Sequence, residues 1–377
     1  MVDRVAVRVE VFAVEDTSVQ VCWDDAPPGE ITVTAGDAAS TVTSRGGPGG
    51  AVVDGLPPGQ AVEVTVRPEG RGLVRAGRVT TLTPPPGRRL SRFATFNDLH
   101  LGARSFGTAH PIWNDDPADP APRRCARAGI AEAVAWGAQA LVAKGDLTQR
   151  GRPHEWDEAA RLLAAPGLPL VVIEGNHETK LGAVDGTEIL ARRGVQLATI
   201  RPGWLDLPGV RIVGLPTAGW HTDEGRVDEA ALQEAAALTA AAAGGAVVVL
   251  HHYPQRFRYQ TLYPSGIPAP GSHHLLDTLA AANPATLVVA GHSHRHRWHR
   301  HATMVVAETG STKDFPGSWT GYTVFEGGII QTSRRILDPS AMAWTSRGRR
   351  VLGGVWGIWA PGVRAHRCFT YPWPPRG

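Results

Sequence analysis

The sequence is poor in cysteine, with only Cys22, Cys125 and Cys368 in 377 residues. These three are odd in number and widely separated, so they provide neither a disulfide framework nor the paired spacing of a thiolate zinc site. We therefore expect reduced thiols, as in a cytoplasmic protein.

Long hydrophobic runs are also missing. The longest apolar stretch, residues 235–249, is rich in alanine and is interrupted by Gly244 and Gly245. It is too short and too weakly hydrophobic to span a bilayer, and the first residues alternate in polarity rather than forming the apolar core of a signal peptide. The sequence therefore predicts a cytoplasmic localisation and no membrane partner.

An excess of charge of one sign is absent as well. The formal net charge is +3, charged residues make up 19% of the chain, and the arginines are scattered. No clear nucleic-acid surface is visible, so a nuclease is the weaker hypothesis. The 42% hydrophobic content is typical of a globular protein, and the length predicts two domains, with the oligomeric state left open.

Residues 1–82 have the pattern of an all-β domain. Apolar and polar residues alternate in three runs separated by glycine and proline turns: residues 5–11, 18–23 and 62–66. Trp23 and the stretch Leu56-Pro57-Pro58-Gly59 resemble a fibronectin type III domain, although Val62 stands where that family usually has a tyrosine. The resemblance implies a small immunoglobulin-like sandwich with a packing role.

Consecutive prolines mark a stiff linker at residues 83–91. Beyond it, strand-like runs alternate with helical ones such as residues 123–139 and 227–243, which is typical of an α/β domain. We predict that this domain spans residues 92–336. The tail, residues 337–377, is rich in tryptophan and glycine and has no period, and we expect it to pack on the α/β domain.

Five apolar runs of the α/β domain end in side chains of the metal-binding type. These residues are, in chain order, Asp98 and His100; Asp146; Asn176; His251; and His292 and His294. Each alone has an ordinary explanation, such as a helix cap, a turn or a core histidine. Because open α/β sheets place their sites at the carboxyl ends of the strands, the repetition indicates one shared metal centre.

The chemistry of these donors limits the metal. Carboxylate, amide and imidazole groups without thiolates suit divalent Mn, Fe, Co, Ni or Zn, whose identity the sequence leaves open. Seven ligands are too many for one tetrahedral ion but suit two ions about 3.5–4 Å apart. Asp146 is the natural bridge, because a carboxylate has two oxygens whereas a neutral histidine cannot bind two ions.

This ordered set of motifs is similar to that of the calcineurin-like metallophosphoesterases. The matching stretches are Asp98-x-His100, Gly145-Asp146, Gly175-Asn176-His177-Glu178, His251 and Gly291-His292-x-His294. The resemblance implies an α/β fold, a four-layer α/β/β/α sandwich. It also implies two ligand sets that share Asp146: Asp98, His100, Asp146 and His294 for one ion, and Asp146, Asn176, His251 and His292 for the other.

The same resemblance implies a mechanism. A hydroxide bridging the two ions would attack phosphorus in line, while His177 contacts the phosphate and either acts as a general acid or only orients the substrate. Glu178 is expected to orient a neighbouring ligand rather than bind metal. Of the adjacent histidines, His251 is the expected ligand because it follows the strand directly, and His252 is expected to pack beside it.

Two further features bear on the substrate. Residues 145–151 resemble the class III cyclic nucleotide phosphodiesterases, whereas a preceding β-sandwich is similar to the purple acid phosphatases. The latter carry a metal-binding tyrosine where this chain has Gln149, so an iron–tyrosinate centre is not expected. Guanidinium groups bind phosphate and aromatic rings stack on bases, so four loop residues are substrate candidates, with solvated loop residues as the alternative: Arg104, Arg256, Arg258 and Tyr259.

These features together predict a phosphoesterase dependent on two metal ions. Its predicted reaction is hydrolysis of phosphodiester bonds in small molecules, of the cyclic nucleotide or glycerophosphodiester type. One alternative is a phosphomonoesterase acting on nucleotides or phosphoproteins. An alternative of another class is a catalytically inactive metal-binding or interaction protein, against which the complete ligand set argues.

Overall fold

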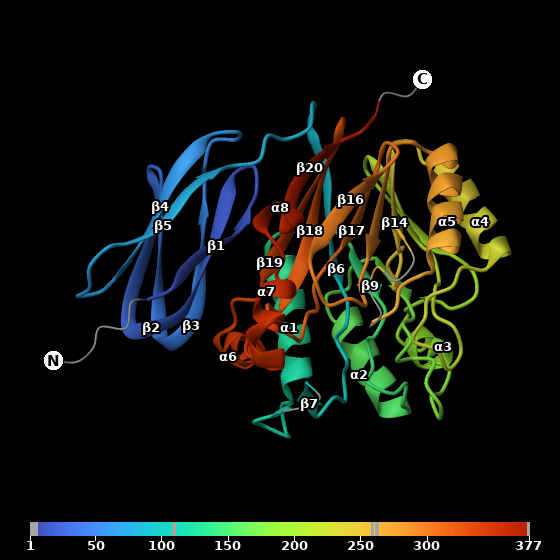
Figure 1. The fold of residues 1–377 in the computed structure, drawn as a ribbon, viewed down its shortest axis with the longest axis horizontal. Helices are drawn as coiled ribbons and strands as arrows, with labels where there is room; N and C mark the ends of the chain where they lie inside the picture. The colour runs from blue at the N-terminus through green and yellow to red at the C-terminus, as the bar shows by residue number, and fades with distance from the viewer. Residues whose placement is uncertain (1–6, 108–110, 258–259, 261–263, 375–377) are drawn as a thin grey trace.

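The computed structural model describes residues 7–107, 111–257, 260 and 264–374. Its N-terminal region is an antiparallel β-sandwich (Figure 1). The strands are β1 (Val9–Val14), β2 (Ser18–Ala35), β3 (Ala38–Asp54), β4 (Ala61–Pro68) and β5 (Val74–Thr80). β1 pairs with β2, β2 pairs with both β3 and β4, and β4 pairs with β5. These strands enclose a core that includes Trp23, Val33 and Val64.

Two strands of this sandwich differ from the sequence prediction. The first described strand begins at Val9 and continues to Val14, so it lies further along the chain than the predicted run at residues 5–11, part of which falls outside the described residues. β2 continues through the proline-containing stretch that follows Trp23. A register shift between Trp23 and Ala26 accommodates that stretch, because a β-bulge lets a strand bend without ending.

The second region contains two stacked β-sheets. The seven-stranded sheet has the order β11-β10-β9-β6-β18-β19-β20. Its strands are β6 (Arg89–Phe96), β9 (Leu141–Lys144), β10 (Leu170–Ile173), β11 (Leu197–Ala198), β18 (Ser318–Phe325), β19 (Gly328–Arg335) and β20 (Cys368–Pro372). The six-stranded sheet has the order β12-β13-β14-β15-β17-β16. Its strands are β12 (Gly203–Leu207), β13 (Val210–Gly214), β14 (Gly245–Val249), β15 (Thr286–Ala290), β16 (Arg297–His301) and β17 (Met304–Glu308).

Helices cover the outer face of each sheet, which gives four layers in the order α/β/β/α (Figure 1). The helices on the seven-stranded sheet are α1 (Ala121–Ala135), α2 (Pro153–Ala164) and α3 (Thr187–Ala191), and those on the six-stranded sheet are α4 (Glu229–Ala240) and α5 (Ala269–Ala282). The predicted helices at residues 123–139 and 227–243 correspond to α1 and α4. Buried valines and isoleucines from both sheets fill the space between them, including Ile173, Val249 and Val289. Continuous apolar strands of this kind are expected where a parallel sheet is covered on both faces.

The C-terminal tail is part of this architecture. It contains α6 (Pro339–Gly348), the 3₁₀ turn η1 (Val351–Gly354), α7 (Trp356–Trp359) and α8 (Arg364–Arg367) before it forms strand β20. β20 pairs with β19 and completes the seven-stranded sheet, so the tail does more than pack on the domain. Another short hairpin, β7 (Ser105–Phe106) with β8 (Ile112–Trp113), lies in the loop after β6.

The N-terminal sandwich is joined to the second region by buried polar contacts. The Gln20 side chain accepts a hydrogen bond from the Arg335 backbone N–H and donates one to its carbonyl, at 2.8 and 2.9 Å. Arg334 forms an ion pair of 2.5 Å with Glu15. Cys22 and Cys368 lie in one apolar cluster at this interface, and all three cysteines are buried and unbonded. Within the described residues, no helix combines the length and hydrophobicity needed to cross a bilayer.

Candidate metal centre

The predicted ligands come together where β6, β9, β10, β14 and β15 end. Their donor atoms fall into overlapping groups in which all atoms lie within 4.8 Å of one another. Two of these groups share Asp146. One contains His100, Asp146 and His177, and the other contains Asp98, Asp146 and His251. The carboxyl ends of neighbouring parallel strands meet at one edge of a sheet, which explains why residues far apart in the sequence converge here.

The backbone at these strand ends has an unusual conformation. Among the described residues, eight other than glycine have a positive φ, and five of them are predicted ligands. These five are Asp98 (54°), His100 (46°), Asp146 (50°), His292 (64°) and His294 (54°). Left-handed backbone is strained for such residues and is concentrated at functional sites, so the surrounding fold holds these side chains in place at a cost in stability.

One half of the centre contains Asp98, His100 and His294. The Oδ2 atom of Asp98 accepts a hydrogen bond of 3.2 Å from the His292 backbone N–H, and its Oδ1 is buried without a hydrogen bond to any described residue. The His294 Nε2 atom lies 3.4 Å from this Oδ1 and 3.4 Å from His100 Nε2. His100 Nε2 is also 3.7 Å from Asp146 Oδ2. A buried oxygen without a partner, facing imidazole nitrogens, is the arrangement expected around a cation.

The other half contains Asn176, His251 and His292. The His251 Nε2 atom lies 3.3 Å from Asp146 Oδ1 and 3.2 Å from Asn176 Oδ1. The opposite ring nitrogen, Nδ1, is 2.8 Å from the Lys144 carbonyl oxygen and donates to it, which leaves the Nε2 lone pair facing the centre. The centroids of the His251 and His292 rings are 5.0 Å apart.

The adjacent His252 occupies a different position. Its ring Nδ1 is 3.1 Å from the Thr217 hydroxyl oxygen, and its Nε2 is buried with no hydrogen-bond partner in the described part of the chain. A donor atom of His252 also lies within 4.8 Å of donors from His251 and His292. His251 therefore faces Asp146 and Asn176, whereas His252 lies next to His292.

Glu178 holds the loop that carries Asp146 through hydrogen bonds. Its Oε2 atom accepts backbone hydrogen bonds from Asp146 and Gly175, both at 2.8 Å. Its Oε1 accepts from the Thr148 backbone and hydroxyl groups at 2.7 and 2.6 Å. Because all four bonds end on loops that carry ligands, Glu178 has the orienting position that the sequence predicted. Burial and the nearby Asp146 raise the pKa of Glu178 to about 8.

Two supporting carboxylates were not predicted from the sequence. Asp314 Oδ2 lies 2.6 Å from His294 Nδ1, which orients the His294 ring, and Asp223 Oδ1 accepts a 2.8 Å hydrogen bond from the Asn176 amide. Such outer partners fix a ligand's tautomer and orientation. Neither residue follows an apolar run or belongs to a motif, so the sequence contains no local signal for them.

The electrostatics of the site favour bound positive charge. Burial alone lowers a histidine pKa, but Asp146 raises the pKa of His251 to about 9, and Asp98 and Asp314 raise that of His294 to about 10. Burial alone would raise the pKa of Asp146, yet His251 and His177 hold it well below its usual value. In the absence of metal, His251 and His294 are therefore protonated at neutral pH. Their positive charge lies where the surrounding donor atoms would bind a metal cation.

His177 and an unpredicted lysine lie at the open side of the centre. The His177 Nδ1 atom is 2.9 Å from the Gln149 carbonyl oxygen, and its Nε2 is 4.0 Å from Asp146 Oδ2. Burial lowers the pKa of His177. The Lys180 ammonium lies 2.9 Å from the same Nε2 atom, so a cation accompanies this histidine.

The structure describes two of the four predicted substrate residues. Arg104 and Arg256 are exposed, and within the described residues no hydrogen bond or ion pair joins either side chain to the centre. Arg258 and Tyr259 lie outside the described residues. Trp356 of the tail is instead near the site, with its ring centroid 6.1 Å from that of His294 and 5.4 Å from that of Phe106.

The fold and the donor set define a metal-dependent phosphoesterase of the four-layer α/β/β/α class. The family described as calcineurin-like phosphoesterase matches residues 91–296, which is more than half of the chain, and the chain belongs to this family. No curated protein matches the chain.

Several solved structures are similar to this chain. PhoD shares 11% sequence identity over 88% of this chain and 87% of its own, with a TM-score of 0.44. A purple acid phosphatase from yellow lupin (Lupinus luteus) seeds shares 12% over 88% and 72%, with a TM-score of 0.47. A putative 5′-nucleotidase from Staphylococcus aureus shares 14% over 66% and 54%, with a TM-score of 0.41.

Proposed function

We propose that the protein hydrolyses phosphodiester bonds of small molecules, of the cyclic nucleotide or glycerophosphodiester type, at a centre of two divalent metal ions. The observation that carries this proposal is the convergence of nitrogen and oxygen donors on both oxygens of Asp146. Its Oδ2 faces His100 and its Oδ1 faces His251, so one carboxylate joins the two halves. A shared carboxylate is the usual bridge in two-metal sites.

The residues fit the proposed ions. Asp98, His100, Asp146 and His294 would hold one ion, and Asp146, Asn176, His251 and His292 would hold the other. The unpartnered Oδ1 of Asp98 and the raised pKa values of His251 and His294 support this assignment, because each reports a place where positive charge is stabilised. When bound, two such cations supply Lewis-acid charge for the phosphoryl oxygens and a nucleophile at neutral pH.

His177 is the proposed catalytic residue that does not bind metal. The Gln149 carbonyl fixes its ring so that Nε2 faces the substrate side of the centre, where it can contact a phosphoryl or leaving-group oxygen. We expect His177→Ala to retain both metals and to lose about 10²- to 10⁴-fold in kcat, the range typical of a missing acid–base group. Metal content by mass spectrometry and steady-state kinetics would check this.

The matched control is His154→Ala, because His154 is exposed and has no predicted role. It should retain both metals and full activity. If His177→Ala lost metal to the same extent as a ligand variant, the assignment of His177 to the substrate rather than to the ions would be wrong.

The preference for diesters is supported by the aromatic residues beside His294. Trp356 and Phe106 provide an apolar surface where a second ester group can pack. The monoesterase alternative is supported by Lys180, whose ammonium beside His177 would pair with the second negative charge of a monoester. Activity towards bis(p-nitrophenyl) phosphate and p-nitrophenyl phosphate with Mn²⁺ distinguishes the two.

A higher kcat/KM for the diester supports our proposal, and a higher value for the monoester overturns it. Lys180→Met sharpens the comparison, because it should reduce monoester turnover more than diester turnover. Fewer than two ions per chain after Mn²⁺ loading, with no hydrolysis of either substrate, would instead support the inactive metal-binding protein.

We further propose the domain organisation expected from the sequence: a fibronectin type III-like sandwich at residues 1–82, a linker at 83–91, the phosphoesterase domain at 92–336 and the tail at 337–377. The pairing of β1–β5 and the buried Trp23 support the first assignment. Strand β6 begins at Arg89, inside the proposed linker, and β20 joins the main sheet from the tail. The cytoplasmic localisation remains a prediction.

A further inference from the structure

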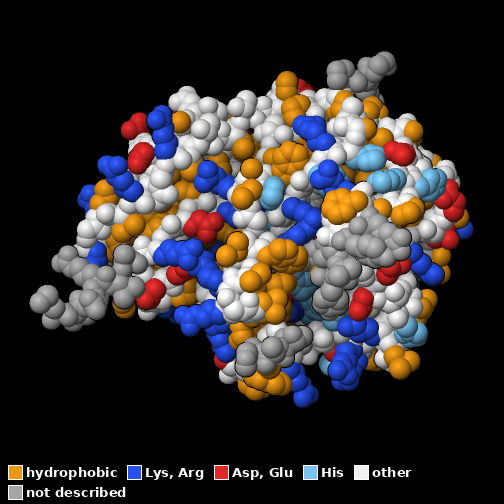
Figure 2. Space-filling view, in the orientation of Figure 1, with side chains coloured by type: hydrophobic (Ala, Val, Ile, Leu, Met, Phe, Trp, Pro, Cys, Tyr) orange, Lys and Arg blue, Asp and Glu red, His pale blue; other side chains and the backbone are white. Residues whose placement is uncertain are grey.

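Part of the C-terminal tail exposes an unusual amount of apolar surface. The described chain has thirteen exposed large hydrophobic side chains, and four of them lie within residues 347–364. These are Leu352, Val355, Ile358 and Val363, with exposed fractions of 59%, 59%, 82% and 58%. Figure 2 shows apolar side chains gathered over α7, with basic side chains, drawn in blue, beside them. We call residues 347–364 the tail surface.

The local backbone directs the turn that carries Leu352 away from the body of the protein. Leu352 adopts left-handed backbone with φ 53°, and Gly353 and Gly354 have φ values of 64° and 94°. A Cβ atom built on either glycine would meet no other atom within 4 Å, so the turn projects into open space. A strained leucine exposed at the tip of a turn is a costly arrangement for a residue without a function.

The charged side chains of the tail surface itself are all basic, and the nearest acidic residues, Asp24 and Glu10, belong to the N-terminal sandwich. Residues 339–374 contain no aspartate or glutamate, although the whole chain has 38 basic and 35 acidic residues. Arg349 and Arg367 of this stretch pair with Asp24 and Glu10 of the N-terminal sandwich. The remaining arginines, Arg347, Arg350 and Arg364, are exposed and form no ion pair with the described residues.

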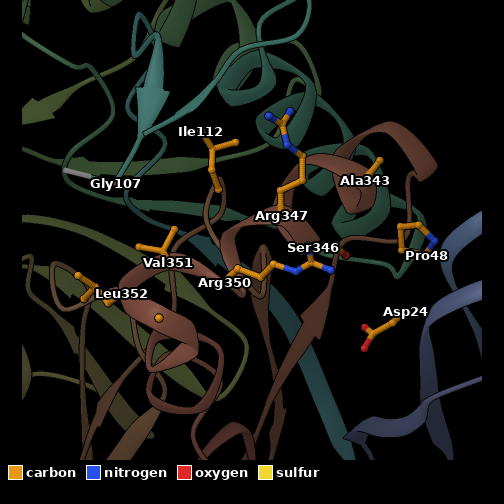
Figure 3. Close-up of a pocket in the computed structure, with 11 residues that line it drawn as sticks. Asp24, Pro48, Gly107, Ile112, Ala343, Ser346, Arg347, Arg350, Val351 and Leu352 are labelled. Atoms are coloured by element: carbon orange, nitrogen blue, oxygen red, sulfur yellow. The ribbon is translucent and has the colours of Figure 1, made fainter. Parts of the chain in front are cut away.

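Two of these arginines line a pocket next to the exposed leucine. The pocket has a volume of about 680 Å³ and is lined by polar groups of Arg347, Arg350 and Ser346 and by apolar side chains that include Ile112 and Leu352. Figure 3 shows the Arg350 side chain extending toward Ser346, with Asp24 across the pocket. Cationic and apolar groups therefore border the same opening.

We infer that the tail surface docks on an anionic phospholipid membrane. Leu352, Val355 and Ile358 would enter the acyl boundary, while Arg347 and Arg350 bind lipid phosphates beside the pocket, the combination that interfacial membrane segments use. A second copy of this chain fits less well, because a two-fold contact would bring the arginines of both copies together while the acidic residues beside them, Asp24 and Glu10, already pair with Arg349 and Arg367.

This docking would bring the metal centre to the lipid surface. Trp356, between Val355 and Ile358, lies against His294 and Phe106. The sequence predicts no membrane partner because it lacks a continuous apolar run long enough to span a bilayer, and in the tail surface glycines interrupt a short apolar run. The inference goes beyond the proposed reaction, since membrane binding can be measured without turnover.

The test is co-sedimentation of the Mn²⁺-loaded full-length protein with vesicles of phosphatidylcholine, with and without phosphatidylglycerol. We expect binding to the anionic vesicles that weakens with salt. The Leu352→Asp/Ile358→Asp variant should bind at least about tenfold more weakly. Each of Arg347→Ala and Arg350→Ala should cost roughly fivefold on anionic vesicles only.

The matched control is Leu73→Asp/Ile200→Asp, which changes two exposed residues outside the tail surface and should bind like the wild type. Retained hydrolysis of bis(p-nitrophenyl) phosphate by the Leu352→Asp/Ile358→Asp variant would show that the fold is intact. Absence of wild-type binding, or equal binding by this variant, overturns the inference. So does a dimer in light scattering that the variant dissociates, because the tail surface would then be a self-interface.

Discussion

The two sheets of the phosphoesterase region contribute different chemistry to one centre. The seven-stranded sheet provides all the predicted oxygen ligands, Asp98, Asp146 and Asn176, together with His100. The six-stranded sheet provides only imidazoles: His251, His292 and His294. Neither sheet alone holds a complete ligand set for either ion, so the centre depends on how closely the edges of the two sheets approach each other.

Buried contacts between the sheets fix this approach. Lys144 on β9 lies with its ammonium 3.4 Å from the Ala290 carbonyl oxygen of β15 and in contact with the Thr309 hydroxyl. Its own carbonyl accepts from His251 of the opposite sheet. Burial lowers the pKa of Lys144 to about 7. A lysine completely buried between the sheets is expensive, and its contacts show that it joins them rather than facing the substrate.

The largest expected effect comes from breaking the bridge between the two sheets. Asp146→Asn keeps the shape of the side chain but removes the negative charge that faces both His100 and His251. We expect both ions to bind more weakly and turnover to fall roughly a thousandfold or more, because several kcal/mol of charge stabilisation depends on the cations being held. Metal content and kcat measured together would check this.

The control for this variant is Asp116→Asn, which changes an exposed aspartate in the same region. It should leave metal content and activity unchanged. Loss of only one ion from Asp146→Asn would mean that Asp146 belongs to one half of the centre and does not bridge.

The next largest effect tests the close approach of the ligand loops. A Cβ atom on Gly175 would lie 2.3 Å from Asp146 Oδ1 and 2.8 Å from His251 Nε2. Gly175→Ala must therefore displace a ligand, and a shift of about 1 Å at a reacting site costs on the order of 100-fold in rate. Gly72→Ala is the matched control, because a Cβ atom there meets nothing within 4 Å. Full activity of Gly175→Ala would show that the loops carrying Gly175, Asp146 and His251 can move apart without loss of catalytic rate.

The sequence was sufficient to predict the alternation of strands and helices and the convergence of the predicted ligands at the strand ends, because both depend on local patterns. Each apolar run that ends in Asp, Asn or His is a strand whose last residues leave the sheet edge, as at Val249 before His251. The α/β/β/α class also followed from the resemblance. The extent of β2 and the pairing of β20 could not be predicted, since both depend on contacts with distant strands rather than on periodicity.

The surroundings of the ligands were harder to predict for a similar reason. Asp314 reaches His294 only through the fold of the chain after β17, whereas Lys180 lies three residues after His177 and contacts it within the loop that follows β10. Arg104 and Arg256 lie in loops beside the predicted ligands, and their contact with substrate stays a prediction because loop position does not determine side-chain direction. Motifs therefore predict which residues bind metal, whereas contacts formed by the folded chain determine which groups orient those residues.

A smaller effect is expected from Asp314, whose carboxylate orients the imidazole ring of His294. Asp314→Asn removes the charge that orients His294 without touching Asp146. We expect the affinity for one ion to fall about 10- to 100-fold, the range found for outer carboxylates, while the other ion stays bound. Titration of metal-free protein with Mn²⁺ would measure the two affinities. Equal weakening of both ions would show that the halves are coupled more tightly than the geometry indicates.

The smallest effect concerns the protons that His251 and His294 should release when metal binds. The raised pKa values of about 9 for His251 and about 10 for His294 mean that both are protonated at pH 7.5 without metal. Metal binding requires neutral imidazole, so each ion should displace one proton, and each affinity should rise about tenfold per pH unit and level off above these pKa values. Calorimetry in buffers with different ionisation enthalpies would count the protons. Asp314→Asn should reduce the proton release from His294 alone, since Asp314 helps to raise the pKa of that histidine. A metal-binding constant that is independent of pH would contradict the assignment of both histidines as ligands.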